Sequence, residues 1–167
     1  MKKIVFVCLL AFISSYTMAQ GTLPEGGKRI NAGFGFSSFG TPVYAGLDFG
    51  LTDEITLGPQ ISYRNYSQRF LGVRFEQDLI LIGVNLDYHF NTLLELPREF
   101  DLYAGVHLGY FIWSDTDDNG FADLESSGFG ASLQVGGRYF FSDEWALNLE
   151  LGGGTVSGGK IGITYQF

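Results

Sequence analysis

The chain ends on a segment in which apolar and polar residues alternate without a break, from Lys160 to Phe167. Apolar residues occupy one parity, and lysine, glycine, threonine and glutamine occupy the other. Because successive side chains of a strand point to opposite faces, this pattern predicts a β-strand with one apolar and one polar face. Such a C-terminal strand is typical of a barrel that spans a membrane, since the last strand closes the sheet between lipid and lumen.

Seven further segments alternate in the same way, with lengths near the roughly 9–11 residues that a tilted strand needs to cross a bilayer. They cover 30–37, 43–51, 55–64, 80–89, 101–110, 129–139 and 145–152. Pro59 removes one ladder donor from the third segment, so we expect a local bulge there. The even count of strands predicts an all-β fold: an eight-stranded, closed, antiparallel, up-and-down transmembrane β-barrel. A soluble glycine-rich sandwich, which alternates in the same way strand by strand, is the competing interpretation.

Aromatic residues and connections distinguish the two ends of the predicted barrel. Aromatic residues gather at strand ends, as expected of girdles at the lipid headgroups. One predicted rim holds Phe49, Tyr88, Phe90, Tyr139, Phe141, Trp145, Tyr165 and Phe167, and the other holds Phe36, Tyr63 and Tyr110. The connections 51–54 and 142–144 are predicted to be tight periplasmic turns, and 65–77 and 114–127 to be long polar outer loops. The segment 91–99 is the exception, because it is long and apolar for a periplasmic turn.

The first nineteen residues have the features of a secretory signal. Lys2 and Lys3 precede an apolar run, 4–13, that is too short to span a membrane as a helix, and Ala19 ends a sequence of the kind that is cleaved. We therefore expect residues 1–19 to be a signal peptide and 20–167 to be one outer-membrane barrel domain. Cys8, the one cysteine of the sequence, lies in this leader, so no disulfide is expected in the mature chain.

The predicted mature chain is strongly acidic. The sequence has 18 Asp and Glu against 10 Lys and Arg, and loss of Lys2 and Lys3 leaves 8 basic residues and a net charge of −10 (8 − 18). A surface of this sign repels phosphates, so we expect no nucleic acid among the partners.

The leader, the eight alternating segments and the terminal strand that ends on Phe167 resemble the small outer-membrane barrels of the OmpX and OmpA-barrel type. The resemblance covers the whole mature chain. It implies insertion into the outer membrane of a Gram-negative-type bacterium with both termini periplasmic. It also implies two partners, the outer-membrane lipids and the barrel-assembly machinery that recognises the last strand.

Charged residues occupy the inward parity of several strands. An eight-stranded barrel encloses a space just wide enough for side chains, and buried charges must pair or be hydrated. We therefore expect an interior network of ion pairs and hydrogen bonds that plugs the lumen, with Lys160 beside Glu150. The predicted network consists of Asp48, Arg64, Asp87, Asp101, His107, Arg138, Glu150 and Lys160. An ion-conducting path along these residues is the alternative.

The segment 115–125 resembles the start of a calcium-binding loop of the EF-hand type. Oxygen ligands at alternate positions wrap a hard cation, and Gly120 would allow the sharp turn. The candidate ligands are Asp115, Asp117, Asn119 and Asp123. The pattern departs from the motif at position 12, where Ser126 stands and the acid comes one residue early, at Glu125. The competing interpretation is an acidic, solvated loop without Ca²⁺. Apart from this possible Ca²⁺, we expect no cofactor.

Catalytic candidates are few. His89 and His107 have inward parity, as do Ser62 and Ser132, but nothing in the sequence couples a serine to a histidine base as a hydrolytic triad requires. We therefore expect no enzymatic activity. The expected role is structural, or contact with an extracellular protein or surface ligand through the outer loops, with 114–127 as the foremost contact site. A narrow porin-like channel for small solutes and, more remotely, a lipid-modifying enzyme are the alternatives.

Overall fold

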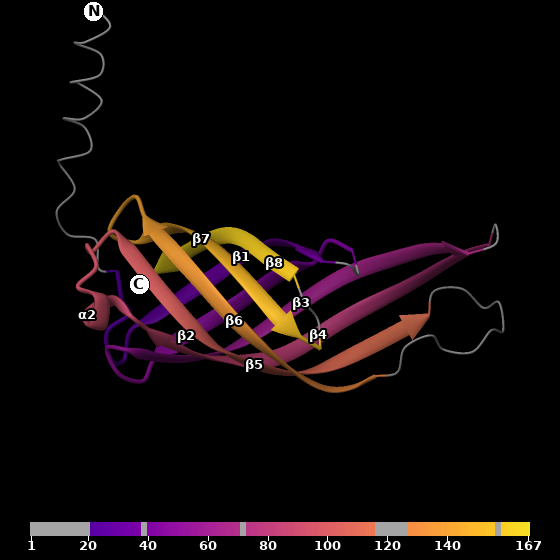
Figure 1. Ribbon diagram of the computed structural model, residues 1–167, viewed down its shortest axis with the longest axis horizontal. Helices are drawn as coiled ribbons and strands as arrows, with labels where there is room; N and C mark the ends of the chain where they lie inside the picture. Colours follow the sequence, from indigo (N-terminus) through magenta and orange to yellow (C-terminus); the bar gives the residue numbers. More distant parts are fainter. Residues whose placement is uncertain (1–20, 38–39, 71–72, 116–126, 156–157) are drawn as a thin grey trace, which may run out of the picture.

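Eight antiparallel strands close into a barrel in the order in which they follow one another along the chain (Figure 1). The computed structural model describes residues 21–37, 40–70, 73–115, 127–155 and 158–167. The strands are β1 Lys28–Ser37, β2 Val43–Gly50, β3 Ile55–Phe70, β4 Val73–His89, β5 Phe100–Asp115, β6 Gly128–Phe140, β7 Trp145–Gly154 and β8 Gly158–Gln166. The predicted fold class and strand count are therefore confirmed, and the predicted leader, 1–19, lies outside the described residues.

The barrel closes where β1 meets β8. Ile30 lies opposite Tyr165 and Phe36 opposite Gly159, so the terminal strand pairs with the first strand over the expected segment. Closure pairs each of the eight strands on both sides around the wall, which is the condition for β-structure to cross a lipid bilayer.

The two faces of the wall differ as the alternation predicts. Large apolar side chains cover the outside along the strands, with Ile61, Val84 and Leu149 between 44% and 52% exposed. The inside is occupied mainly by buried polar and charged side chains. In lipid this arrangement places hydrocarbon against hydrocarbon and keeps the polar groups within the barrel, so the wall suits a membrane. Among the described residues, no helix is long and apolar enough to cross a membrane.

The two ends of the barrel have different connections, and we name them accordingly. The turn end holds both ends of the barrel domain, the tight turns after β2 and β6, and the short helix α2, Asn91–Leu94. The loop end holds the other connections. Exposed aromatic rings border the turn end, and several contact one another, as Trp145 and Tyr165 do with centroids 4.8 Å apart. At the loop end, Tyr110 and Phe129 form such a pair at 4.9 Å.

The expected loop 65–77 is wrong, because the structure continues β3 and β4 through it as a hairpin. The register runs without interruption from Asn65 opposite Asp78 to Phe70 opposite Val73. In Figure 1 this hairpin extends well beyond the loop-end limits of β1, β7 and β8. The segment contains Tyr66, Phe70, Val73 and Phe75, residues that favour strands, so the sequence is compatible with continuation of the hairpin. β5 likewise continues to Asp115, so Ser114 and Asp115 belong to this strand and not to the expected loop 114–127.

The bulge expected at Pro59 is also wrong. Gly46 lies opposite Gln60 and Phe49 opposite Leu57, so the offset between β2 and β3 is the same on both sides of the proline. No residue has been inserted. A Cβ added to Gly58 would collide with the carbonyl oxygen of Leu47. The glycine therefore lets the two backbones approach closely beside the proline, and the register is kept.

Candidate functional site in the barrel lumen

Five buried side chains from five strands form one group inside the turn end, which we call the ion cluster: Arg29, Asp48, His89, Asp101 and Arg138. Arg29 Nε donates to Asp48 Oδ2 at 2.9 Å, and Arg29 Nη1 donates to Asp101 Oδ2 at 3.2 Å. Arg138 Nη1 donates to the same Asp101 oxygen at 2.9 Å, and Arg138 Nη2 lies 3.4 Å from Asp48 Oδ2. Two guanidiniums thus share two carboxylates across the lumen.

The partners of His89 determine where its proton lies. Nε2 is 3.1 Å from Arg29 Nη2 and 3.0 Å from Thr56 Oγ1. A guanidinium can only donate, so Nε2 is the acceptor and the proton is on Nδ1. Nδ1 then donates to Asp101 Oδ1 at 2.6 Å. With a neutral imidazole, the ion cluster carries two positive and two negative charges, which is the balance that burial requires.

A cation–π contact and a hydrogen bond connect the ion cluster to the middle of the lumen. The ring of Tyr103 lies beneath the Arg138 guanidinium, 4.2 Å from its carbon, and the Tyr103 hydroxyl donates to Glu150 Oε2 at 3.0 Å. Glu150 Oε1 is 2.5 Å from Lys160 Nζ, so these two residues form the ion pair that the strand register allows. Asp87 accepts from Gln134 Nε2 at 2.7 Å.

The turn end of the lumen is filled. Arg29 and Asp101 have no exposed surface, and Phe140 on the same inner face is 1% exposed. The segment that precedes β1 passes over this end. Gly21 lies against Phe100 and Asn91, and the N–H of Gly26 donates to the carbonyl oxygen of Gly50 at 2.9 Å. Leu23, within this crossing segment, is 1% exposed. Together these residues are packed at the turn end of the lumen.

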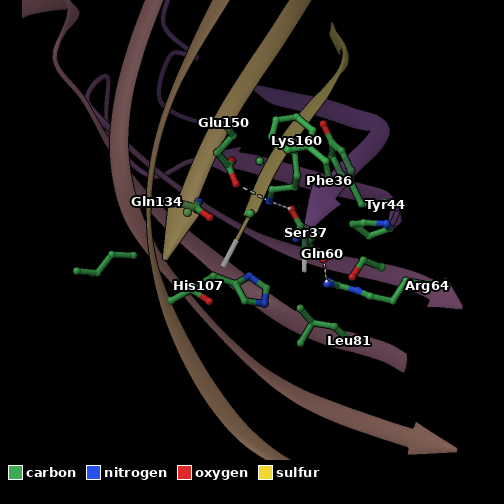
Figure 2. Close-up of a pocket in the computed structure, with 17 residues that line it drawn as sticks. Phe36, Ser37, Tyr44, Gln60, Arg64, Leu81, His107, Gln134, Glu150 and Lys160 are labelled. Carbon is green, nitrogen blue, oxygen red and sulfur yellow. Dashed lines mark hydrogen bonds and ion pairs between the residues drawn. The ribbon is translucent and has the colours of Figure 1, made fainter. Parts of the chain in front are cut away.

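The loop end of the lumen contains a cavity of about 70 Å³ (Figure 2), which we call the loop-end cavity. Its polar lining includes Arg64, Ser62, Gln60, His107, Glu150 and Lys160. Apolar residues form part of its wall, and among them Leu81 packs with the buried Leu79 and Phe111 on the inner face of β4 and β5.

A chain of hydrogen bonds orients the polar groups on one side of this cavity. Lys160 Nζ donates to Gln60 Oε1 at 3.1 Å, and Asn85 Nδ2 donates to the same oxygen at 3.2 Å. Asn85 therefore presents its Oδ1 to His107 Nδ1, which lies 2.5 Å away and must carry the proton. His107 Nε2 is left as a buried lone pair without a partner.

The structure places the eight predicted lumen residues at three levels along the lumen, and contacts through Tyr103, Gln60 and Asn85 link these levels. Asp48, Asp101 and Arg138 belong to the ion cluster. Asp87, Glu150 and Lys160 lie in the middle of the lumen. Arg64 and His107 line the loop-end cavity, and neither bonds to the ion cluster.

Two residues of the ion cluster were absent from the predicted network. His89 has inward parity in the sequence, but it carries no fixed charge. Arg29 stands just before the first alternating segment, which begins at Ile30. Because Asn31 has inward parity, extending the same alternation back by two residues places Arg29 inside, where the structure has it. Both residues are fully or almost fully buried in the structure.

The positions of the candidate catalytic and metal-binding residues can now be compared with what each kind of site requires. Ser62 Oγ has no hydrogen-bond partner, and His107 bonds to Asn85, so no serine–histidine pair forms between them. The described residues contain no group of three or more His, Cys, Asp or Glu side chains placed to hold a metal ion. The candidate calcium ligands Asp117, Asn119 and Asp123 lie outside the described residues, and Asp115 is the last residue of β5.

Solved structures similar to this chain share its fold. OprG from Pseudomonas aeruginosa matches with a TM-score of 0.67 and 12% identity, over 89% of this chain and 99% of that one. Ail, the attachment invasion locus protein of Yersinia pestis, matches with a TM-score of 0.59 and 9% identity, over 86% and 99%. Neisserial surface protein A (NspA) matches with a TM-score of 0.57 and 14% identity, over 84% and 95%. Identities this low establish a common fold only.

No curated protein sequence matches the chain. The model of one family, described as the outer membrane protein beta-barrel domain, matches residues 5–166, which is nearly the whole sequence. The closed barrel, its apolar outer face and its polar interior agree with that match. The protein therefore belongs to the outer membrane protein beta-barrel domain family.

Proposed function

We propose that this protein is an integral outer-membrane barrel with a closed lumen, which acts at the cell surface through its loop end and has no catalytic role. In this proposal the turn end, with both termini, faces the periplasm. The observation that carries it is the ion cluster: two arginines and two aspartates, all 4% exposed or less, hydrogen-bonded across the lumen. A solute would have to separate these pairs, and a buried charge without its partner is strongly unfavourable.

The loop end supports the contact role. The β3–β4 hairpin holds its strand register to Phe70 and Val73, so it offers an ordered backbone platform beyond the barrel wall. The acidic segment 116–126 follows β5 at the same end. Ail has been crystallised with the heparin analogue sucrose octasulfate, and NspA is named as a surface protein, so barrels of this fold include proteins that present a binding surface.

The expected partners are an extracellular protein or surface ligand at the loop end and outer-membrane lipids around the wall. The barrel-assembly machinery is the expected partner during insertion, acting on β8. Exposed apolar side chains along the whole wall support the lipid contact. The alternation of β8, the last strand of the chain, supports its role as the strand that this machinery recognises.

Single-channel recording in a planar bilayer tests the closed lumen. The purified barrel is expected to give no steady openings. The control is the variant Arg98→Met, purified in the same way and altered at an exposed residue between α2 and β5, which should also give none. Steady openings of the unmodified protein would overturn the proposal and favour the narrow channel.

Orientation is tested separately, with a short epitope inserted between β3 and β4 or, in a second variant, after Asp143 in the turn between β6 and β7. Antibody should reach the first epitope on intact cells and the second only after the outer membrane is permeabilised. The reverse pattern would show that the turn end faces outward.

A further inference from the structure

Arg64 differs from the other cations of the lumen. Arg29, Arg138 and Lys160 each lie within 3.4 Å of a carboxylate oxygen. Arg64 is 5% exposed, and within the part of the chain that the structure describes no carboxylate lies within ion-pair distance of it. A buried guanidinium without a counter-charge is strongly unfavourable, so its position at a cavity points to an anion from solution.

The unused edge of the Arg64 guanidinium is the one suited to an oxyanion. Nη1 donates to Ser37 Oγ at 3.1 Å, which leaves the edge formed by Nε and Nη2. Nε is buried and has no hydrogen-bond partner. Two parallel N–H donors on one edge match two oxygens of a carboxylate, phosphate or sulfate. Figure 2 shows the guanidinium end of Arg64 directed toward Ser37 and Gln60, into the group of cavity residues.

A second unpartnered donor lies on the same strand and face. Ser62, two residues before Arg64 on β3, is 5% exposed and its Oγ has no partner. Both residues line the loop-end cavity. A hydroxyl can donate to an anion oxygen. Two adjacent inward positions of β3 therefore present unused donors to one space.

The remaining lining favours an anion. Arg64 and Lys160 contribute two positive charges and Glu150 one negative charge, and Lys160 Nζ lies against the Glu150 carboxylate at 2.5 Å. The net charge of the lining is thus +1 (2 − 1), counting the histidine as neutral. His107 Nε2 carries a lone pair, so it is not counted among the donors to an anion.

The size of the cavity limits the ligand. One water needs roughly 10–15 Å³ of such space, so a cavity of about 70 Å³ holds a few waters or one small ion. The ends of β1 and β8, at Ser37 and Gly158, border the cavity on the side where the wall stops earliest at the loop end. The cavity lies on the loop-end side of the ion cluster, so an ion that arrives from the loop end does not have to pass that cluster.

We propose that the loop-end cavity binds one small free oxyanion, of the carboxylate, phosphate or sulfate class, on the Nε–Nη2 edge of Arg64 with Ser62 Oγ as a further donor. The bound anion supplies the counter-charge that Arg64 lacks among the described residues. This site is independent of the closed lumen, since it lies on the loop-end side of the ion cluster.

The test measures unfolding in urea, in maltoside micelles that carry no phosphate. Sulfate, inorganic phosphate and acetate are each compared with chloride at equal ionic strength. An ion that binds the folded protein alone raises its stability with ion concentration. Because sulfate stabilises proteins generally, the measured quantity is the difference between the unmodified protein and Arg64→Met. Arg98→Met, the same change at an exposed site, is the matched control.

The unmodified barrel and Arg98→Met should gain a saturable stabilisation with at least one oxyanion, and Arg64→Met should lose at least tenfold in apparent affinity. Ser62→Ala keeps the charge and should weaken binding about fivefold, the effect of one hydrogen bond. In chloride alone, Arg64→Met should be as stable as the unmodified protein or more so. Equal responses of the unmodified protein, Arg64→Met and Ser62→Ala to all three oxyanions would overturn the proposal.

Discussion

Asp101→Ala is the change that most strongly perturbs the ion cluster. The Asp101 carboxylate accepts from Arg138 at 2.9 Å, from Arg29 at 3.2 Å and from His89 at 2.6 Å, and it is fully buried. Without it, two guanidiniums share the single carboxylate of Asp48, and the group carries one uncompensated positive charge. We expect a loss of about 3–5 kcal/mol in the free energy of unfolding, the range found when one partner of a buried ion pair is removed.

Charge balance, as well as the number of hydrogen bonds, determines this loss. Removal of Arg29 from the Asp101→Ala variant leaves Arg138 with Asp48, one charge of each sign. The double variant Asp101→Ala with Arg29→Met should therefore lose less stability than the sum of the two single losses. The expected coupling is about 0.5–3 kcal/mol, as for residues within one network.

Urea unfolding of the barrel in lipid vesicles measures these differences. Trp145 is exposed on the outer face, so its fluorescence reports departure from the lipid. Asp143→Ala, in the exposed turn between β6 and β7, is the matched control and should change stability by less than about 0.5 kcal/mol. A loss below about 1 kcal/mol for Asp101→Ala, or strictly additive effects of the two changes, would refute the reasoning from the ion cluster.

The close strand contacts, the membrane barrel and the acidic loop each lead to a further prediction. Gly58→Ala should destabilise the barrel by about 1–3 kcal/mol, because the added Cβ would collide with the Leu47 carbonyl oxygen. Gly128→Ala, with open space around the added Cβ, should be tolerated. Equal urea unfolding midpoints for the two variants would contradict this prediction. The closed barrel should shift its gel mobility on heating and leave membranes only with detergent, and release by salt or osmotic shock would contradict a membrane barrel. If the segment 115–125 holds calcium, calorimetric titration of the mature protein should show saturable binding below millimolar Ca²⁺, and its absence would end that hypothesis.

The part of the fold that could be predicted from the sequence is the part that strand parity determines. The eight segments, the closure of β8 on β1 and the inward placement of Asp48, Asp101 and Arg138 follow from alternation alone. Parity is weaker where alternation is locally lost. Residues 79–82 are all apolar, so only the parity of Asn85 and Asp87, extended back along β4, indicates that Leu79 and Leu81 face the lumen.

The grouping of the lumen residues was beyond the sequence, because it depends on the stagger between strands. Parity places Arg64 and Arg138 on the same inner face, and the predicted loop 65–77 and turn 142–144 place them near opposite ends, but neither feature gives the partners of each side chain. The register puts Arg138 beside Asp101, near the start of β5, and Arg64 beside Leu79, toward the loop end of β4. This separation leaves Arg64 without a carboxylate partner among the described residues and makes the loop-end cavity a binding candidate.

Thiol labelling of the lumen tests the closed turn end most directly. Thr164 has no exposed surface and donates to Asn31, which in turn donates to Asp48 in the ion cluster. Ser132 lines the loop-end cavity and is half-buried. With the barrel in vesicles, a small charged thiol reagent is predicted to label Ser132→Cys and to leave Thr164→Cys unmodified from either side. Labelling of both variants at similar rates would contradict a closed lumen.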